Sequence, residues 1–149
     1  MKHHPLCLFV LVSASFAYGQ SSTQTEKVLT KIMDIPVPGP AVRFDYQTFD
    51  PSSGRLYIAH MNADQLVAFD TSKRQVVANL DGFRRVHGVT VAPEIHRLYA
   101  SVTGNHQVAA VDTESLKTLG AAGPIMYPDG LACAPKQDKV FVSDIQPVK

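Results

Sequence analysis

The sequence predicts an all-β fold made of repeated four-stranded units, and two observations support this. First, the phrase Pro51-Ser-Ser-Gly-Arg-Leu-Tyr57 returns as Pro93-Glu-Ile-His-Arg-Leu-Tyr99 and as Pro135-Lys-Gln-Asp-Lys-Val-Phe141, always 42 residues further on. Second, apolar and polar residues alternate between polar turns, which is typical of half-buried strands. A repeat of this length built from short strands indicates the blades of a β-propeller.

Each full repeat is expected to supply four strands joined by tight turns, which makes one antiparallel blade. The strands expected in the first repeat are residues 46–50, 55–60, 65–70 and 75–80. Those expected in the second repeat are residues 88–92, 97–102, 107–112 and 117–119, and the third repeat adds residues 130–134 and 139–144. We therefore divide residues 43–149 into repeats at 43–84, 85–126 and 127–149.

Two segments precede the repeats. Residues 1–19 have the pattern of an export signal, with Lys2, an apolar run and a small-x-small cleavage site at Ala17-Tyr18-Gly19, although a cut after Ala17 fits almost as well. Residues 20–42 follow as an outer strand over Lys27 to Ile35 and a proline-rich linker. This pattern predicts a periplasmic or secreted protein without a membrane span.

The repeats amount to about two and a half blades, whereas a propeller needs about four or more to close. Either the sequence is a fragment of a longer protein, which we favour, or several copies assemble into one ring as a homo-oligomer. Tyr57, Tyr99 and Phe141 recur on the second strands and are expected to pack between blades.

The composition is that of a globular protein, because 45% of the 149 residues are hydrophobic and 18% are charged. A formal net charge of +1 gives no electrostatic reason to expect nucleic acid as a partner. After signal removal Cys133 is the only cysteine, so no internal disulfide can form. Cys133 shares a repeat column with Phe49 and Val91, which favours a buried structural thiol over a reactive or metal-bound one.

The sharpest candidate site is the repeat column Asp45, His87 and Asp129. Each residue comes just before an expected innermost strand, where adjacent blades converge on the central channel. Two carboxylates and an imidazole suit a divalent metal, with histidine moving the preference toward zinc, manganese or iron. The competing interpretation is that these residues cap strand ends and bind a neighbouring blade or channel water.

A second column lies two residues earlier and contains Arg43, Arg85 and Tyr127. These side chains are candidates for a rim that orients an anionic or sugar-like ligand, although solvated rim charges are the simpler interpretation. His60, His96 and His106 occupy different phases of the repeat, so we expect surface histidines.

Asp70 and Asp112 end third strands and are expected to accept hydrogen bonds from turn N–H groups. The sequence has no Gly-x-Ser-x-Gly elbow, no His-Glu-x-x-His, no phosphate loop and no Cys-x-x-Cys. Nucleophilic, phosphoryl-transfer and haem chemistry therefore have no motif to support them.

The segments Arg55-Leu-Tyr-Ile-Ala, Leu66-Val-Ala-Phe-Asp-Thr and Gln75-Val-Val-Ala-Asn-Leu resemble the YVTN-repeat, YncE-like family of exported seven-bladed propellers. Arg97-Leu-Tyr-Ala-Ser, Val108-Ala-Ala-Val-Asp-Thr and Lys139-Val-Phe-Val-Ser-Asp repeat the likeness, which covers about Arg43 to Asp144. The resemblance implies the propeller fold, and it says little about activity because such repeats serve many roles.

Tyr127-Pro-Asp-Gly-Leu-Ala132 is also similar to a segment of gluconolactonase and lactonase propellers. That resemblance implies that Asp129 helps to hold a divalent metal in the channel. The chain departs from the pattern, because His87 stands where those enzymes usually carry an asparagine and no channel glutamate can be assigned.

Three functions therefore stay open after the sequence alone. The first is an exported, non-catalytic propeller module that binds a protein or a small ligand across its rim or channel. The second is a metal-dependent hydrolase of lactonase type, with Asp129 and His87 holding the ion and Asp45 as a ligand or general base. The third is a structural repeat remnant without activity of its own.

Overall fold

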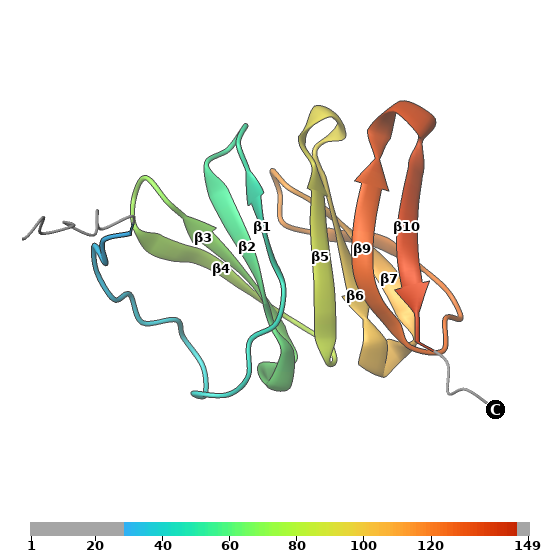
Figure 1. Ribbon diagram of the computed structural model, residues 1–149, viewed down its shortest axis with the longest axis horizontal. Helices are drawn as coiled ribbons and strands as arrows, with labels where there is room; N and C mark the ends of the chain where they lie inside the picture. The colour runs from blue at the N-terminus through green and yellow to red at the C-terminus, as the bar shows by residue number, and fades with distance from the viewer. Residues whose placement is uncertain (1–28, 146–149) are drawn as a thin grey trace, which may run out of the picture. The chain divides into compact units, whose positions relative to one another are not determined.

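The computed structural model describes residues 29–145, and its strands form three antiparallel sheets (Figure 1). The chain divides into two units, residues 1–33 and 34–149, and every strand among the described residues lies in the second unit. The expected export signal and residues 20–28 lie outside the described part of the chain. No helix in residues 29–145 is long and apolar enough to cross a membrane.

Each sheet is a simple up-and-down meander, because strands that follow each other in the chain are paired. The first sheet comprises β1 (Gln47–Asp50), β2 (Arg55–His60), β3 (Gln65–Asp70) and β4 (Gln75–Asp81). The second comprises β5 (Val86–Ala92), β6 (Arg97–Val102), β7 (Gln107–Asp112) and β8 (Thr118–Ala122). The third pairs β9 (Pro128–Ala134) with β10 (Lys139–Asp144). The predicted partial propeller of four-stranded blades is confirmed.

The predicted strands differ from the observed ones mainly at two places. β5 and β9 begin before the glycine at which we expected them to start, so His87 and Asp129 lie inside strands rather than ahead of them. β8 extends through Gly120-Ala121-Ala122, small residues with a low strand propensity, because their backbones pair with β7. Pairing within the sheet therefore overrides the local preference.

The recurring proline phrase encodes the turn between the first two strands of a blade. Pro93 and Pro135 each begin a 3₁₀ turn, and a residue in the left-handed conformation, His96 or Asp138, ends it. Proline fits this position because its fixed φ suits the first residue of such a turn. In the first blade Gly54 takes the left-handed position with φ of 66°.

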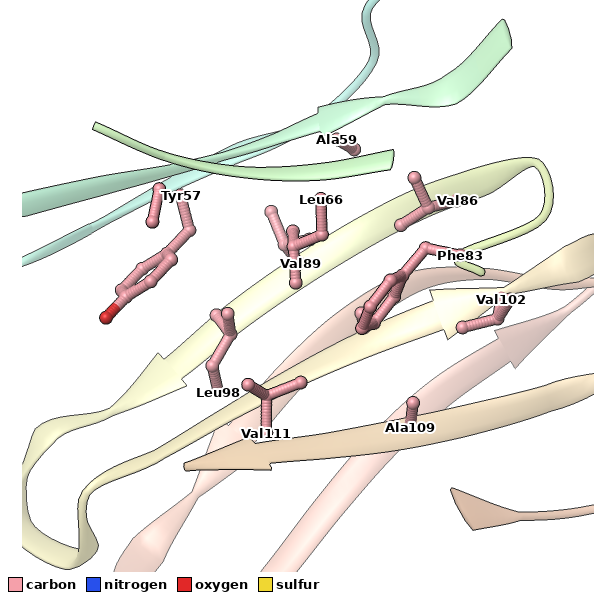
Figure 2. Packing of buried hydrophobic residues seen from close by; sticks show 12 residues of the cluster. Tyr57, Ala59, Leu66, Phe83, Val86, Val89, Leu98, Val102, Ala109 and Val111 are labelled. Carbon is pink, nitrogen blue, oxygen red and sulfur yellow. The ribbon is translucent and has the colours of Figure 1, made fainter. Parts of the chain in front are cut away.

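The apolar core lies between the first two sheets, where Figure 2 shows Tyr57 and Leu66 opposite Leu98 and Val111. All four side chains are fully buried, and each contributes about 1.5–3 kcal/mol by leaving water. Inner strands β1 and β5 lie side by side, as do β5 and β9, so consecutive sheets meet along these strands. This contact brings the residues at the starts of the inner strands together.

Residues 29–35, the described part of the expected outer strand, are not in a β-strand, and Leu29 and Ile32 are more than 80% exposed. One sequence expectation needs correction. Phe141 was expected to pack between blades, as Tyr57 does, but it is 59% exposed. The reason is that Phe141 lies on β10, and no sheet among the described residues packs on that face of the two-stranded sheet.

Candidate functional site

The structure brings Asp45, His87 and Asp129 together at the starts of three neighbouring inner strands. Nδ1 of His87 lies 2.9 Å from Oδ2 of Asp45 and 3.5 Å from Oδ1 of Asp129. Asp45 is fixed just ahead of β1, where its backbone N–H donates to the carbonyl of Ala59. The predicted column is therefore a physical cluster with the imidazole at its centre.

Only one of the two ring nitrogens of His87, Nδ1, has a hydrogen-bond partner in the described part of the chain. Because the Asp45 carboxylate is an acceptor, Nδ1 carries the proton and donates to it. Nε2 is buried and has no hydrogen-bond partner, and the whole residue is only 6% exposed. In the neutral ring this leaves a lone pair on Nε2, and a buried polar atom without a partner costs about 1–3 kcal/mol. The cost falls when a ligand or water donates to Nε2.

Ser101 on β6 fixes the backbone around this cluster. Its hydroxyl accepts a hydrogen bond from the N–H of Gly88 at 2.6 Å and donates to the carbonyl of Asp129 at 2.5 Å. A Cβ at Gly88 would lie 2.2 Å from that same carbonyl, so only glycine allows β5 and β9 to approach so closely. Ser101 and Gly88 thereby set the position of Asp129 against His87.

Two of the three predicted rim residues contact the cluster with their side chains. Arg43 places Nη2 3.5 Å from Oδ2 of Asp45 and is largely exposed. The ring centroid of Tyr127 lies 5.5 Å from that of His87, tilted by 59°. Arg85 is exposed and acts through its backbone, whose N–H donates to Oδ1 of Asp64 at 2.8 Å. The side chains of Arg43 and Tyr127 thus flank the cluster.

In this structure the three side chains form a hydrogen-bonded cluster. Nδ1 of His87 lies at hydrogen-bond and ion-pair distances from the two carboxylates. Nowhere in residues 29–145 do three or more His, Cys, Asp or Glu side chains stand where they could hold a metal ion. The arrangement instead resembles the outer-shell pattern in which a carboxylate orients a histidine and leaves its other nitrogen available.

His60 corrects a further expectation, because it is fully buried rather than a surface residue. Its ring stacks on Phe44 with centroids 4.1 Å apart and planes 11° apart. A Cβ at Gly39 would lie 3.4 Å from the His60 ring, so the segment before β1 also covers it. Neither ring nitrogen has a hydrogen-bond partner.

The buried side-chain atoms without partners in residues 29–145 gather at one end of the blades, which we call the open end. These atoms belong to His60 at the end of β2, Gln65 at the start of β3, Asn79 near the end of β4 and His87 at the start of β5. The inner strands start at this end, which lies at the bottom of Figure 1. Native proteins leave few buried polar groups unpaired, so such a concentration points to a place where other molecules bind.

The opposite end of the blades, which we call the capped end, has its carboxylates satisfied by turns. Oδ1 of Asp70 accepts the backbone N–H groups of Ser72 and Lys73 and the hydroxyl of Ser72, all at 2.7–3.0 Å. The Lys73 N–H contributes most to lowering the pKa of Asp70 to about 2. In Asp112 the N–H of Ser115 is the main cause of a lowered pKa. The predicted turn role of Asp70 and Asp112 is confirmed.

Cys133 is half-buried with a free thiol, so it is less enclosed than the repeat column indicated. Burial is the main cause that raises its pKa, and the negative charge of Glu94 adds to the effect. A raised pKa disfavours the reactive thiolate. This supports the structural interpretation of Cys133.

The sequence carried signals for some of the residues that we missed. Ser101 and Ser143 share a repeat column, as do Gly88 and Gly130, and the N–H of Gly130 also donates to the hydroxyl of Ser143, at 2.9 Å. Comparing these columns would have revealed the serine contact. The burial of His60 had no such signal, because it depends on the segment before the first repeat.

Comparisons with known proteins agree with this geometry at the level of the fold. Neither a scan against protein-family models nor a search of curated proteins gave a match. Solved structures similar to this chain are β-propellers, so the chain has the fold of part of a β-propeller.

Three of these structures are hydrazine synthase from Kuenenia stuttgartiensis, U3-55K, and the β-propeller domain of Cps50 (Swd1) from Myceliophteria thermophila. Their TM-scores are 0.61, 0.56 and 0.50, and their sequence identities to this chain are 18%, 12% and 14%. The matches cover 72%, 64% and 57% of this chain but only 32%, 29% and 27% of the other chains. The chain therefore spans about a third of the length of these proteins, and the likeness extends to the fold alone.

Proposed function

We propose that the chain is a non-catalytic binding module of the β-propeller class whose ligand site is the open end. The observation that carries this proposal is the buried, unpartnered Nε2 of His87, held by the carboxylate of Asp45 on the other side of the ring. The sequence pattern of the blades supports a place among exported, YncE-like YVTN-repeat propellers in the periplasm or outside the cell.

The chemistry of the open end defines the ligand class. A neutral Nε2 accepts a hydrogen bond, as do the carboxylates of Asp45 and Asp129, while Arg43 donates from the rim. A ligand that satisfies these groups carries several O–H or N–H donors and at least one acceptor. Sugars, polyols and peptide backbones have this combination.

The experiment is a thermal-shift screen of the chain against monosaccharides, polyols and short peptides. We expect compounds that raise the melting temperature of the wild type to have no effect on His87→Phe, which keeps an aromatic ring but removes both nitrogens. The matched control is His96→Phe at the capped end, which should respond as the wild type does. Equal responses of His87→Phe and wild type, or a panel without any response, would contradict the proposal.

A metal-dependent hydrolase of lactonase type is the second candidate, favoured by the carboxylate that orients His87 and leaves Nε2 available. It requires Asp129 as a ligand, and therefore a rearrangement of the contact between Asp129 and His87. Calorimetric titration with Zn²⁺ or Mn²⁺ tests it, because Asp129→Ala should then lose the binding. Identical binding by wild type and Asp129→Ala would count against a hydrolase.

A further inference from the structure

His60, at the end of β2, is a titratable residue at a position that the next blade fills with an apolar one. Val102 stands 42 residues further on, is 2% exposed and belongs to the apolar core. Its partner across the sheet is Val86, which stands 42 residues after Phe44. In the first blade the same pair is an imidazole stacked on an aromatic ring, with the centroids of His60 and Phe44 4.1 Å apart. His60 is nevertheless fully buried.

The cover over His60 is residues 36–44, which we call the strap and which lead toward β1 in Figure 1. The strap reaches the imidazole through Phe44 and through Gly39, where an added Cβ would lie 3.4 Å from the ring. Three strap residues are prolines, which have no N–H to donate. Among the described residues, one backbone hydrogen bond ties the strap to the first blade, from the N–H of Asn62 to a strap carbonyl at 3.2 Å. Packing on the His60 ring is therefore a main part of what holds the strap.

The ring of His60 has no polar partner in the part of the chain that the structure describes. Both of its nitrogens are buried without a hydrogen bond. The strap presents Phe44 and Gly39 to the ring, and β3 places the neutral amide of Gln65 directly across from it. The charged groups of the neighbouring elements have other partners: Asp81 accepts from Gln65, Asp64 accepts from the N–H of Arg85, and Asp45 faces Arg43 and His87.

The protonation state of His60 therefore decides whether the strap can stay closed. A neutral imidazole can pack between the strap and the sheet, as valine packs in the next blade. An imidazolium carries two donors and a charge, and burial without acceptors strongly disfavours it. Water supplies the acceptors once the strap lifts, so the proton binds the open form and shifts the population toward it. Since an imidazole in water takes up its proton between about pH 8 and pH 5, the strap opens as the pH falls through this range.

We propose that the strap is a pH-sensitive switch that closes over neutral His60 and opens when His60 is protonated. Its last residue, Phe44, is joined directly to Asp45, whose Oδ2 lies 2.9 Å from Nδ1 of His87. Opening withdraws Phe44 from His60, and with it the carboxylate from His87. The switch itself does not depend on the function proposed above, whereas its control of the open end rests on that function.

The test measures ¹⁵N relaxation of the strap amides in the full chain at about pH 7.5 and about pH 5. For the wild type we expect order parameters of about 0.85 at the higher pH and below about 0.6 at the lower one. Amides of the core strands β6 and β7 should stay ordered at both. A wild-type strap that is equally ordered at the two pH values would overturn the proposal.

The decisive variant is His60→Val, which introduces the residue that the next blade carries at this position. Its strap should stay ordered at both pH values. His60→Phe should behave in the same way and keeps the ring stack, so it replaces the valine variant if that one folds poorly. The matched control is His96→Asn, which removes an exposed imidazole at a left-handed position that asparagine tolerates, and it should behave as the wild type. Loss of strap order at the lower pH in both His60 variants would overturn the proposal, because another group would then control the strap.

Phe44→Ala tests the link to the open end at the higher pH. It removes the stack on His60 without protonation, so we expect a disordered strap and a changed ¹⁵N shift of Nδ1 in His87. An unchanged His87 shift beside a disordered strap would overturn control of the open end by the strap. The ligand site is judged separately, by the thermal-shift screen with His87→Phe, so the two proposals can fail independently.

Discussion

Gly88 and Gly130 show how one repeat position can be structural in one blade and unconstrained in another. At Gly88 the neighbouring inner strand leaves no space for a side chain, since a Cβ would lie 2.2 Å from the carbonyl of Asp129. At Gly130 the nearest atom would be Oγ of Ser143 at 3.4 Å, the far end of a side chain. The difference arises because the third sheet packs on β5, whereas no further sheet among residues 29–145 packs on β9.

We therefore expect Gly88→Ala to lower the free energy of unfolding by about 1–3 kcal/mol or more, because β9 must move away. The same change at Gly130 should be nearly neutral, or stabilising by up to about 1 kcal/mol as glycine is replaced within a strand. Urea denaturation of both variants measures this difference. Equal losses would show that β5 and β9 do not approach as described.

Acid should destabilise the chain through the capped end. The pKa of Asp70 is about 2 in the folded protein, below the value of about 3.9 in an unfolded chain. A lowered folded-state pKa gives stability that is complete above the unfolded value and is lost as pH falls through the folded value. In Asp50 burial opposes this effect, but the hydroxyls of Ser52 and Ser53 still lower the pKa.

Unfolding free energies measured by urea denaturation between about pH 5 and pH 2 should accordingly decrease. Asp70→Asn removes one of the titrating carboxylates, so its decrease should be shallower than that of the wild type. A wild-type stability that stays constant or rises over this range would contradict the assignment of these turn hydrogen bonds.

At the scale of elements, the repeat predicted the strands well because each strand satisfies the same alternation in every blade. The order and pairing of strands within each sheet followed directly from the tight turns. What the sequence did not predict depends on neighbours in space, because β8 extends to Ala122 by pairing with β7. Local pattern fixes a strand only where a partner is present.

Tyr57 and Tyr99 test the packing of elements, because they hold the same position on β2 and β6. Tyr57 is fully buried in the core, whereas Tyr99 is half-buried and lines a cavity of about 270 Å³ between the second and third sheets. Tyr57→Ala should cost about 3–5 kcal/mol, the usual range for a buried aromatic side chain, and Tyr99→Ala clearly less. Thermal or urea unfolding measures both costs. An equal loss of stability would mean that Tyr99 is packed as tightly as Tyr57.

At the scale of the whole molecule, the two ends of the blades have different chemistry. The capped end satisfies its carboxylates within its own turns, whereas the open end buries polar nitrogens and oxygens without partners. The sequence placed Asp45, His87 and Asp129 in one column, and the structure makes them neighbours. It could not show that Nδ1 of the imidazole would face the Asp45 carboxylate, since that depends on distances of a few ångströms between blades.

The most direct measurement of the open-end assignment is the tautomer of His87, read from the ¹⁵N chemical shifts of its imidazole at a pH where the ring is neutral. The structure requires the proton on Nδ1, facing Asp45, and a lone pair on the buried Nε2. Observation of that tautomer, with the Nε2 shift moving when a ligand is added, is the expected result. A proton on Nε2 would contradict the account, because Nε2 would then offer a ligand no acceptor and Nδ1 would have no proton to donate to Asp45.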